Sequence, residues 1–302
     1  MRPQRALLSG HRQHFAHGPI DLVIGAEGEA CAVAAAHEAA WQRFATVLDE
    51  LVAELPALRR AVAGSCPLQG RIARRMWQAC SPFRGRFITP MAAVAGAVAQ
   101  ELIAAYEREG IDRAWVNNGG DIALHLASGR SLRVGLLADL ARTGELLQRG
   151  APGLDAHFTV TSDLPVRGIA TSGWRGRSFS LGIADSVTVL ARSASEADAA
   201  ATMVANAVDV DDARIVRRPA CELKDDSDLG DIPVTVDVPV LARETVERAL
   251  GAGLLLAREL QSAGLIWSCV LVCQGGVAST DGAGPAALST AARSPTAAAL
   301  AL

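Results

Sequence analysis

Residues 197–202 place Asp198 and Thr202 four positions apart in a run that is otherwise alanine. At the period of an α-helix, both side chains face the same way. A helix is expected here because Ser193 and Glu196 form a capping box and small apolar residues continue beyond Thr202. The chain must therefore fold around a nearly apolar helix that carries one polar stripe.

That stripe has two interpretations. A buried carboxylate without a partner costs on the order of several kcal/mol, so Asp198 and Thr202 both need polar partners. Mg²⁺ prefers oxygen ligands, and both residues would then be ligands of a bound Mg²⁺ ion. Alternatively, Asp198 caps a neighbouring loop and Thr202 hydrogen-bonds to its own helix. The spacing alone leaves both interpretations open.

The composition is that of a compact soluble protein. The chain has 302 residues, of which 50% are hydrophobic, and a formal net charge of −3. These values suit one large domain or two closely packed domains. No apolar run approaches the ~20 residues that cross a bilayer, and residues 1–11 do not form a secretory signal. We therefore expect a cytoplasmic protein with no membrane partner.

Cysteines and basic residues exclude further classes. The six cysteines are far apart and form no CxxC pair, so we expect neither disulfides nor a zinc site. All basic residues except Lys224 are arginines, which are scattered among 32 acidic residues without forming a basic stripe. We expect no nucleic-acid partner, whereas assembly of identical subunits stays open.

Periodicity and turn signals predict a mixture of strands and helices. Thr89 and Pro90 are typical of a helix start, and that helix is expected to end near Gly110. A strand at 115–116 should lead into the polar loop 117–121, followed by a hairpin of residues 122–126 and 132–136. Further strands are expected over 20–24, 158–161, 186–190, 231–238 and 265–272, and further helices over 29–58 and 243–263. Residues 278–302 have little to bury and are expected to form a disordered tail.

Three segments follow one another in the order Asn-Gly-Gly-Asp-Ile at 118–122, Ala-Thr-Ser-Gly at 170–173, and a Ser-Val-Thr-Val strand at 186–189 that runs into the helix of Asp198 and Thr202. In this order they resemble the ApbE superfamily of FAD:protein FMN transferases. The resemblance implies an α+β fold of mixed and antiparallel sheets packed with helices. It also implies that a flavin nucleotide, FAD or FMN, and Mg²⁺ bind where these loops meet. Asp198 and Thr202 match the family's metal ligands, which favours the metal site.

The sequence also departs from the transferases. Where they carry His-Ile-x-Asp-Pro-x-Thr-Gly, this chain reads Arg-Ser-Phe-Ser-Leu-Gly-Ile-Ala-Asp at 177–185, so the histidine is absent and Asp185 is the nearest candidate for a catalytic base. The Ala-Lys-Gly of the family is replaced by residues 94–97, and no Asp-Gly-x-Ser-Gly-Ala-Thr acceptor signature is present. The strings 87–99, 173–185 and 226–234 are similar to an uncharacterised, cytoplasmic ApbE-like branch. Residues 1–277 are thus expected to form one ApbE-like domain.

The candidate cofactor-binding residues lie in the two motif loops and just after the second. The first loop suits hydrogen bonds to a flat heterocycle, although a type I′ turn explains the same residues. The second loop offers hydroxyl and N–H groups to a phosphate, and the arginines after it could bind phosphate oxygens in pairs. The residues are Asn118, Gly119, Gly120, Asp121, Thr171, Ser172, Gly173, Arg175 and Arg177. The acidic residues at 225, 226, 228 and 231 indicate a solvated loop.

These observations favour an ApbE-like protein that binds a flavin nucleotide with Mg²⁺, as a divergent flavin transferase or an FAD pyrophosphatase. In either reaction the ion would offset charge on phosphate oxygens. The alternative is a carrier or sensor that binds a flavin or a pterin without bond cleavage. An oligomeric scaffold with a vestigial pocket is a third interpretation.

Overall fold

The computed structural model describes residues 2–136 and 156–281. Its strands in chain order are β1 (Gln4–Leu7), β2 (Gln13–His17), β3 (Ile20–Gly28), β4 (Ile111–Asn118), β5 (Asp121–Leu126), β6 (Ser131–Leu136), β7 (Ala156–Thr161), β8 (Gly168–Ser172), β9 (Ser186–Ala191), β10 (Val216–Pro219), β11 (Pro233–Asp237), β12 (Ser268–Cys273) and β13 (Gly276–Ser279). The α-helices are α1 (Ala30–Ala53), α2 (Leu55–Leu58), α3 (Arg71–Cys80), α4 (Val94–Ile103), α6 (Ala194–Ala207), α7 (Ala220–Leu223) and α8 (Arg243–Ser262).

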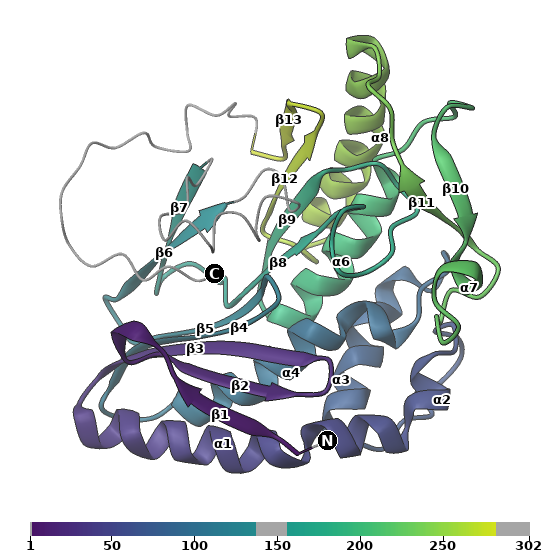
Figure 1. Ribbon diagram of the computed structural model, residues 1–302. Helices are drawn as coiled ribbons and strands as arrows, with labels where there is room; N and C mark the ends of the chain where they lie inside the picture. The colour runs from purple at the N-terminus through teal and green to yellow at the C-terminus, as the bar shows by residue number, and fades with distance from the viewer. Residues whose placement is uncertain (1, 137–155, 282–302) are drawn as a thin grey trace.

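One large sheet organises the described residues. Its strand order is β1-β2-β3-β4-β5-β8-β9-β12-β13, and every neighbouring pair is antiparallel. Helices α4 and α6 pack on its central strands, and the β6–β7 ribbon stands apart from them (Figure 1). The α+β class expected from the sequence is therefore confirmed.

Side chains alternate between two faces of this sheet. Ala114 and Val116 of β4 belong to the large core shared with the helices, whereas Trp115 between them belongs to a smaller cluster with Leu132 and Val160 of the ribbon. Successive residues of a strand point to opposite faces. Both faces of the central strands are therefore covered, which explains their nearly continuous apolar sequences.

Two local expectations were wrong. The turn after β5 forms as expected, but β6 pairs with β7 in a separate two-stranded sheet and forms no hairpin with β5. Residues 90–93 form a short 3-10 helix before α4, and Thr89 provides no side-chain cap. Its hydroxyl donates instead to the carboxylate of Asp228, so a long-range contact replaces the local one.

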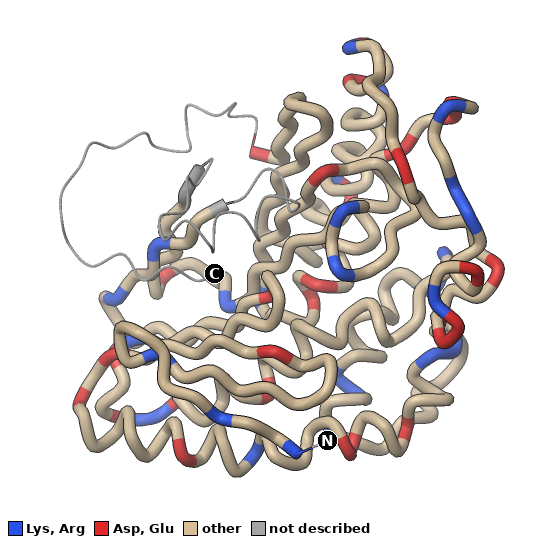
Figure 2. The backbone as a smooth tube through the Cα atoms, viewed as in Figure 1, with Lys and Arg blue, Asp and Glu red and all other residues tan. Residues whose placement is uncertain are grey.

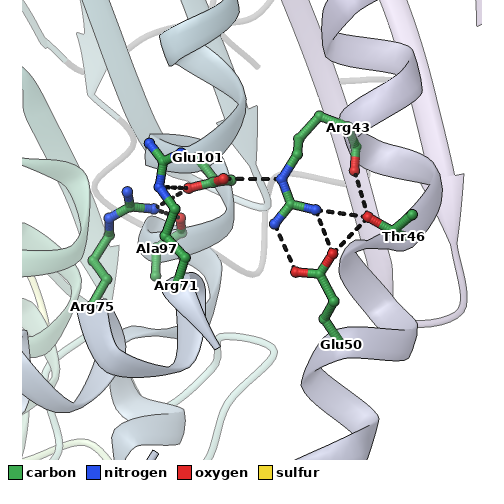
Figure 3. Close-up of polar contacts among 7 residues, drawn as sticks. All are labelled: Arg43, Thr46, Glu50, Arg71, Arg75, Ala97 and Glu101. Atoms are coloured by element: carbon green, nitrogen blue, oxygen red, sulfur yellow. Dashed lines mark hydrogen bonds and ion pairs between the residues drawn. The ribbon is translucent and has the colours of Figure 1, made fainter. Parts of the chain in front are cut away.

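A buried ion network fixes α4 against its neighbours. Glu101 of α4, 4% exposed, accepts hydrogen bonds from Arg43 of α1 at 2.9 Å and from Arg75 of α3 at 2.7 Å (Figure 3). Arg43 also pairs with Glu50 at 2.6 Å. A carboxylate this buried is tolerated only when it is paired and hydrogen-bonded. The network therefore sets the position of the helix whose N-terminal turn reaches the site described below.

The C-terminal part of the fold extends slightly past the expected domain end. Ala278, expected in the tail, pairs with Leu271 in β13, and Asp281 accepts a 2.6 Å hydrogen bond from Ser268. Residues 282–302, the rest of the expected tail, lie outside the described residues. Within the described ranges no helix is both long and apolar enough to cross a membrane.

Candidate functional site

A cavity of about 260 Å³ lies between α6, the start of α4, residues 177–181 and the loop after α7. Asp198, Thr202, Asp121 and Arg177, all expected site residues, line it. Most of its other lining residues fall in the strings 87–99, 173–185 and 226–234, two more belong to α6, and Arg59 and Lys224 lie outside these segments. The other lining residues are Arg59, Phe87, Ile88, Thr89, Met91, Ala92, Val94, Ala95, Ser178, Phe179, Leu181, Met203, Asn206, Lys224, Asp226, Ser227, Asp228 and Leu229.

Helix α6 begins as the sequence predicts. The Ser193 hydroxyl caps it by accepting from the backbone N–H of Glu196, so Asp198 and Thr202 lie one turn apart on the cavity side. The Asp198 carboxylate accepts a 2.8 Å hydrogen bond from the N–H of Gly96 in α4. A Cβ at Gly96 would lie 2.2 Å from the carbonyl oxygen of Ala194, so only glycine permits this approach.

Asp121 reaches the same cavity from the sheet. It follows the β4–β5 turn, where Gly119 and Gly120 have φ angles of 67° and 114°, as a two-residue hairpin turn of glycines allows. Its carboxylate accepts a 3.3 Å hydrogen bond from the backbone N–H of Thr171 in β8. The turn interpretation therefore holds, and the turn places Asp121 in the cavity lining.

Asn118 acts next to this turn rather than in the cavity lining. Its amide donates to the carbonyl oxygen of Ala95 at 3.1 Å, which ties the end of β4 to the start of α4. Neighbouring Asn117 accepts from the N–H of Gly120 at 2.8 Å. The two asparagines thus hold the backbone next to Asp121 in place.

Burial raises the proton affinity of both carboxylates. Burial raises the pKa of Asp121 well above its usual range, and the charge of Asp198 raises it further. Burial raises the pKa of Asp198 to about 7, against the lowering effect of the N–H groups of Gly96 and Ala95. Two buried carboxylates that line one cavity favour binding of a proton or a cation.

The donor set fits a hard cation. No group of three or more His, Cys, Asp and Glu side chains suitable for a metal occurs in the described part of the chain. Asp121, Asp198 and Thr202 nevertheless give the cavity two carboxylates and a hydroxyl, which are oxygen ligands. Mg²⁺ typically binds through one or two carboxylates and completes its shell with water and substrate phosphates. This set therefore suits Mg²⁺ better than zinc.

The Thr-Ser-Gly motif lies beside the cavity, not in its lining. Thr171 and Ser172 belong to β8, which the sequence analysis treated as a loop, and Gly173 follows directly. The Thr171 hydroxyl bonds that of Thr188 in β9 at 3.0 Å. These residues position Asp121 through the N–H of Thr171.

The two arginines that follow the Thr-Ser-Gly motif, Arg175 and Arg177, have different surroundings. Arg177 lines the cavity and donates to the carbonyl oxygen of Pro19 at 3.2 Å. Arg175 is not part of the lining, and its guanidinium lies 4.7 Å from the ring centre of Trp174. Their positions shortly after the motif could not reveal this difference.

Asp185 lies outside the cavity lining. Its carboxylate accepts from the backbone N–H of Gln274, and its own N–H donates to the carbonyl oxygen of Val272 at 2.9 Å. Gln274 adopts a φ of 43°, which is uncommon for a residue other than glycine. The contacts of Asp185 thus hold the β12–β13 turn.

The acidic loop after α7 was expected to be a solvated loop, but residues 226–229 of it line the cavity. Asp226 pairs with Arg59 at 2.8 Å, and Asp228 accepts from the buried Thr89 hydroxyl. Figure 2 shows basic and acidic positions side by side around α7 and this loop. In the sequence, the string 226–234 and Lys224, the sole lysine of the chain, pointed to this loop.

The chain belongs to the family whose model is described as AbpE bacteria, which matches residues 5–279. This confirms the resemblance to ApbE-like proteins. The chain is 35% identical over 210 residues to a UPF0280 protein of Methanopyrus kandleri, covering 68% of this chain and 78% of that protein. It is 40% identical over 144 residues to a UPF0280 protein of Methanothermobacter thermautotrophicus, covering 46% and 50%.

Several other archaeal relatives are likewise matched over about half of their own length. Among solved structures, the apo flavinyl transferase ApbE of Pseudomonas stutzeri matches with 13% sequence identity and a TM-score of 0.42, covering 93% of this chain and 95% of that one.

Proposed function

We propose that this protein binds a flavin nucleotide, FAD or FMN, together with Mg²⁺ in the cavity of Asp198, and that it acts as a divergent flavin transferase or an FAD pyrophosphatase. The observation that carries the proposal is the meeting of Asp121 and Asp198 in one cavity beside Thr202. Two carboxylates whose pKa values are raised by burial, that of Asp121 also by the charge of Asp198, mark a site that gains from a bound cation. Membership of the AbpE family supports the flavin as the ligand class.

In this proposal the residues that line the cavity have separate roles. Asp121, Asp198 and Thr202 hold the ion, which supplies positive charge to phosphate oxygens when bound. Arg177 binds a phosphate group at the rim, because guanidinium to phosphate hydrogen bonds are charge-assisted. Phe87, 42% exposed, offers an apolar surface to a heterocyclic ring.

The size of the cavity limits how a dinucleotide would bind. Sites for drug-sized ligands typically measure about 300 to 1,000 Å³, whereas this cavity measures about 260 Å³. One part of FAD would fit inside, and the remainder would extend out of the mouth. The proposal thus places the phosphates, not the whole dinucleotide, next to the carboxylates.

A carrier or sensor of a flavin or pterin is the second candidate function. It is favoured by the contacts of Asp185, whose carboxylate is engaged by Gln274 and lies outside the cavity lining. Without the histidine of the transferases, no other base is identified by the family pattern. Binding without bond cleavage would need only the cavity and the ion.

The experiment is incubation with FAD and Mg²⁺, followed by chromatography for AMP and by fluorescence titration of the bound flavin. Saturable binding with AMP release supports the enzyme, and saturable binding without AMP release supports the carrier. Asp198→Asn should lose the Mg²⁺ dependence in either case, while Asp211→Asn, an exposed aspartate outside the lining, should retain it. Absence of flavin binding in the presence of Mg²⁺ would refute the enzyme and the flavin carrier, and the same titration with a pterin tests the remaining form of the carrier.

A further inference from the structure

Two cations at the cavity wall share one carboxylate of the protein itself. Arg59 contacts one oxygen of Asp226 at 2.8 Å, and the ammonium group of Lys224 lies 3.7 Å from the other oxygen. All three residues line the cavity. Arg59 comes from the segment after α2, so residues far apart in the sequence converge on one carboxylate.

This arrangement has the chemistry of an anion site. A guanidinium and an ammonium placed on the two oxygens of a carboxylate can bind the oxygens of a phosphate in the same way. Arg59 and Lys224 also lower the pKa of Asp226, which keeps that carboxylate ionised at neutral pH. Asp226 therefore occupies the position of an anionic ligand.

The internal contact is suited to exchange. The side chains of Arg59, Lys224 and Asp226 are 32%, 66% and 56% exposed, respectively. Ion pairs this exposed contribute little to stability, because water screens them. An incoming group with two negative charges would thus compete well with the single charge of Asp226.

The rest of the loop can keep its contacts while the Asp226 side chain moves away from Arg59 and Lys224. The N–H of Cys221 donates to the carbonyl oxygen of Gly230 at 2.8 Å and closes the loop. Asp228 is held separately by the hydroxyl of Thr89, a residue only 2% exposed. Exchange at Asp226 therefore requires movement of residues 224–227 and leaves the rest of the wall intact.

We propose that Arg59 and Lys224 form an anion subsite of the cavity that Asp226 occupies internally, and that a phosphate-bearing ligand binds by displacing Asp226. This inference depends on the proposed function only for the identity of the phosphate-bearing ligand. Asp226 is then a specificity-determining residue, since it excludes weakly charged ligands and admits those that carry enough negative charge to replace it.

The test is calorimetric titration with inorganic pyrophosphate in EDTA, so that no metal at Asp198 takes part. Asp226→Asn should bind pyrophosphate about tenfold more tightly than the wild type, because the internal competitor is removed. Asp225→Asn is the matched control. This substitution removes the same charge at the neighbouring position. The side chain of Asp225 is exposed and forms no ion pair with a described residue. Arg59→Gln in the Asp226→Asn background should abolish the gain.

Lys224 provides a second readout, because it is the only lysine of the chain. An amine-selective acylating reagent can modify only Lys224 and the N-terminus, so peptide mass mapping reports the accessibility of this one side chain. Pyrophosphate should protect Lys224, and protection should occur at lower concentration in Asp226→Asn.

Equal effects of Asp226→Asn and Asp225→Asn would overturn the subsite, since general charge would then explain the gain. Failure of pyrophosphate to protect Lys224 in either protein would also overturn it. The subsite stands if pyrophosphate binds as expected and FAD does not, in which case the flavin proposal alone fails.

Discussion

The Asp198 carboxylate accepts its hydrogen bond from the N–H of Gly96, a residue 102 positions earlier in the chain. The bond joins α6 to the start of α4 at the cavity that both helices line. It also fixes the orientation of the Asp198 carboxylate in the cavity lining. The site thus depends on the packing of the two helices, and its first test is the response to a cation.

Mg²⁺ should raise the melting temperature of the wild-type protein in a concentration-dependent manner, because an ion bound only by the native state stabilises it by mass action. Asp198→Asn should remove this shift, whereas Asp211→Asn should keep it. Differential scanning calorimetry with and without FAD measures both. An unchanged melting curve of the wild type at millimolar Mg²⁺ in both conditions would refute the metal site.

The pH dependence of that stability follows from the raised pKa of Asp198. Its pKa is about 7 in the fold against 3.8 for an ordinary aspartate, so the folded state binds the proton more tightly. The resulting stabilisation is complete below about pH 3.8 and is lost as the pH rises through about 7. Without metal, the wild type should therefore lose stability between pH 4 and 8 relative to Asp198→Asn, by roughly 1 to 4 kcal/mol.

Added Mg²⁺ should reverse this trend, since a cation binds the deprotonated carboxylate. The Mg²⁺-induced shift in melting temperature should be larger at pH 8 than at pH 5. Titration of melting temperature at both pH values tests the sign, and a larger shift at pH 5 would exclude Asp198 as a ligand.

Arg177 and Arg175 provide a matched pair for the phosphate contact. Arg177→Ala should weaken FAD or AMP binding, by about tenfold for the loss of one charge-assisted contact worth about 1.4 kcal/mol. Arg175→Ala should leave affinity nearly unchanged, because that guanidinium lies over Trp174 outside the lining. Calorimetry distinguishes them, and equal losses would remove the distinction that the structure makes.

Glu101 should matter more for stability than Glu50. The side chain of Glu101 is 2% exposed, and its loss leaves Arg43 and Arg75 without their buried partner. Glu101→Gln should destabilise the fold by about 3 kcal/mol, whereas Glu50→Gln, on a carboxylate that is 41% exposed, should cost about 0.5 kcal/mol. Urea unfolding measures both values.

The lowered pKa of Glu101 allows a pH test of its contribution to stability. Burial would raise the pKa of Glu101, but hydrogen bonds from Arg75 and Arg43 outweigh it and lower the pKa below 4.5. The stabilisation is present above pH 4.5 and is lost as the pH falls through the lowered pKa. The difference between wild type and Glu101→Gln should therefore shrink under acid conditions, and a constant difference would contradict the ionic role.

Local signals predicted much of the central fold. The start of α6, its two polar residues and the β4–β5 turn follow from capping, helix period and paired glycines, which act within a few residues. β1 was not predicted, because its four residues are all exposed and show no apolar alternation. α3 was not predicted either, although buried Ile72, Met76 and Ala79 follow the helix period.

The site was less predictable because its walls come from distant segments. Arg59 and Asp226 are 167 positions apart, and nothing near either residue indicates that they meet. The Thr89 hydroxyl was expected to cap a helix and instead binds Asp228. Motifs identify residues that act with their chain neighbours, whereas these contacts depend on how the helices and the α7 loop pack together.

Transfer of FMN to protein should be absent or very slow, even if FAD binds. The transferases' histidine is replaced in residues 177–185, and loss of a positioned general base typically costs a factor of ~10² to 10⁴. The measurement is the mass of a substrate domain bearing Asp-Gly-x-Ser-Gly-Ala-Thr after incubation with FAD, Mg²⁺ and this protein. An active transferase of the superfamily is the positive control.

Asp185→Asn separates the two interpretations of the remaining carboxylate. The contact of Asp185 with Gln274 implies a structural role, so the variant should lower the melting temperature while any slow FMN transfer or AMP release per folded molecule stays unchanged. If Asp185 were the base instead, turnover per folded molecule would fall by ~10²-fold or more. Rapid, stoichiometric FMN addition by the wild type would contradict the weight placed on the missing histidine, and its loss in Asp185→Asn would assign the base to this carboxylate.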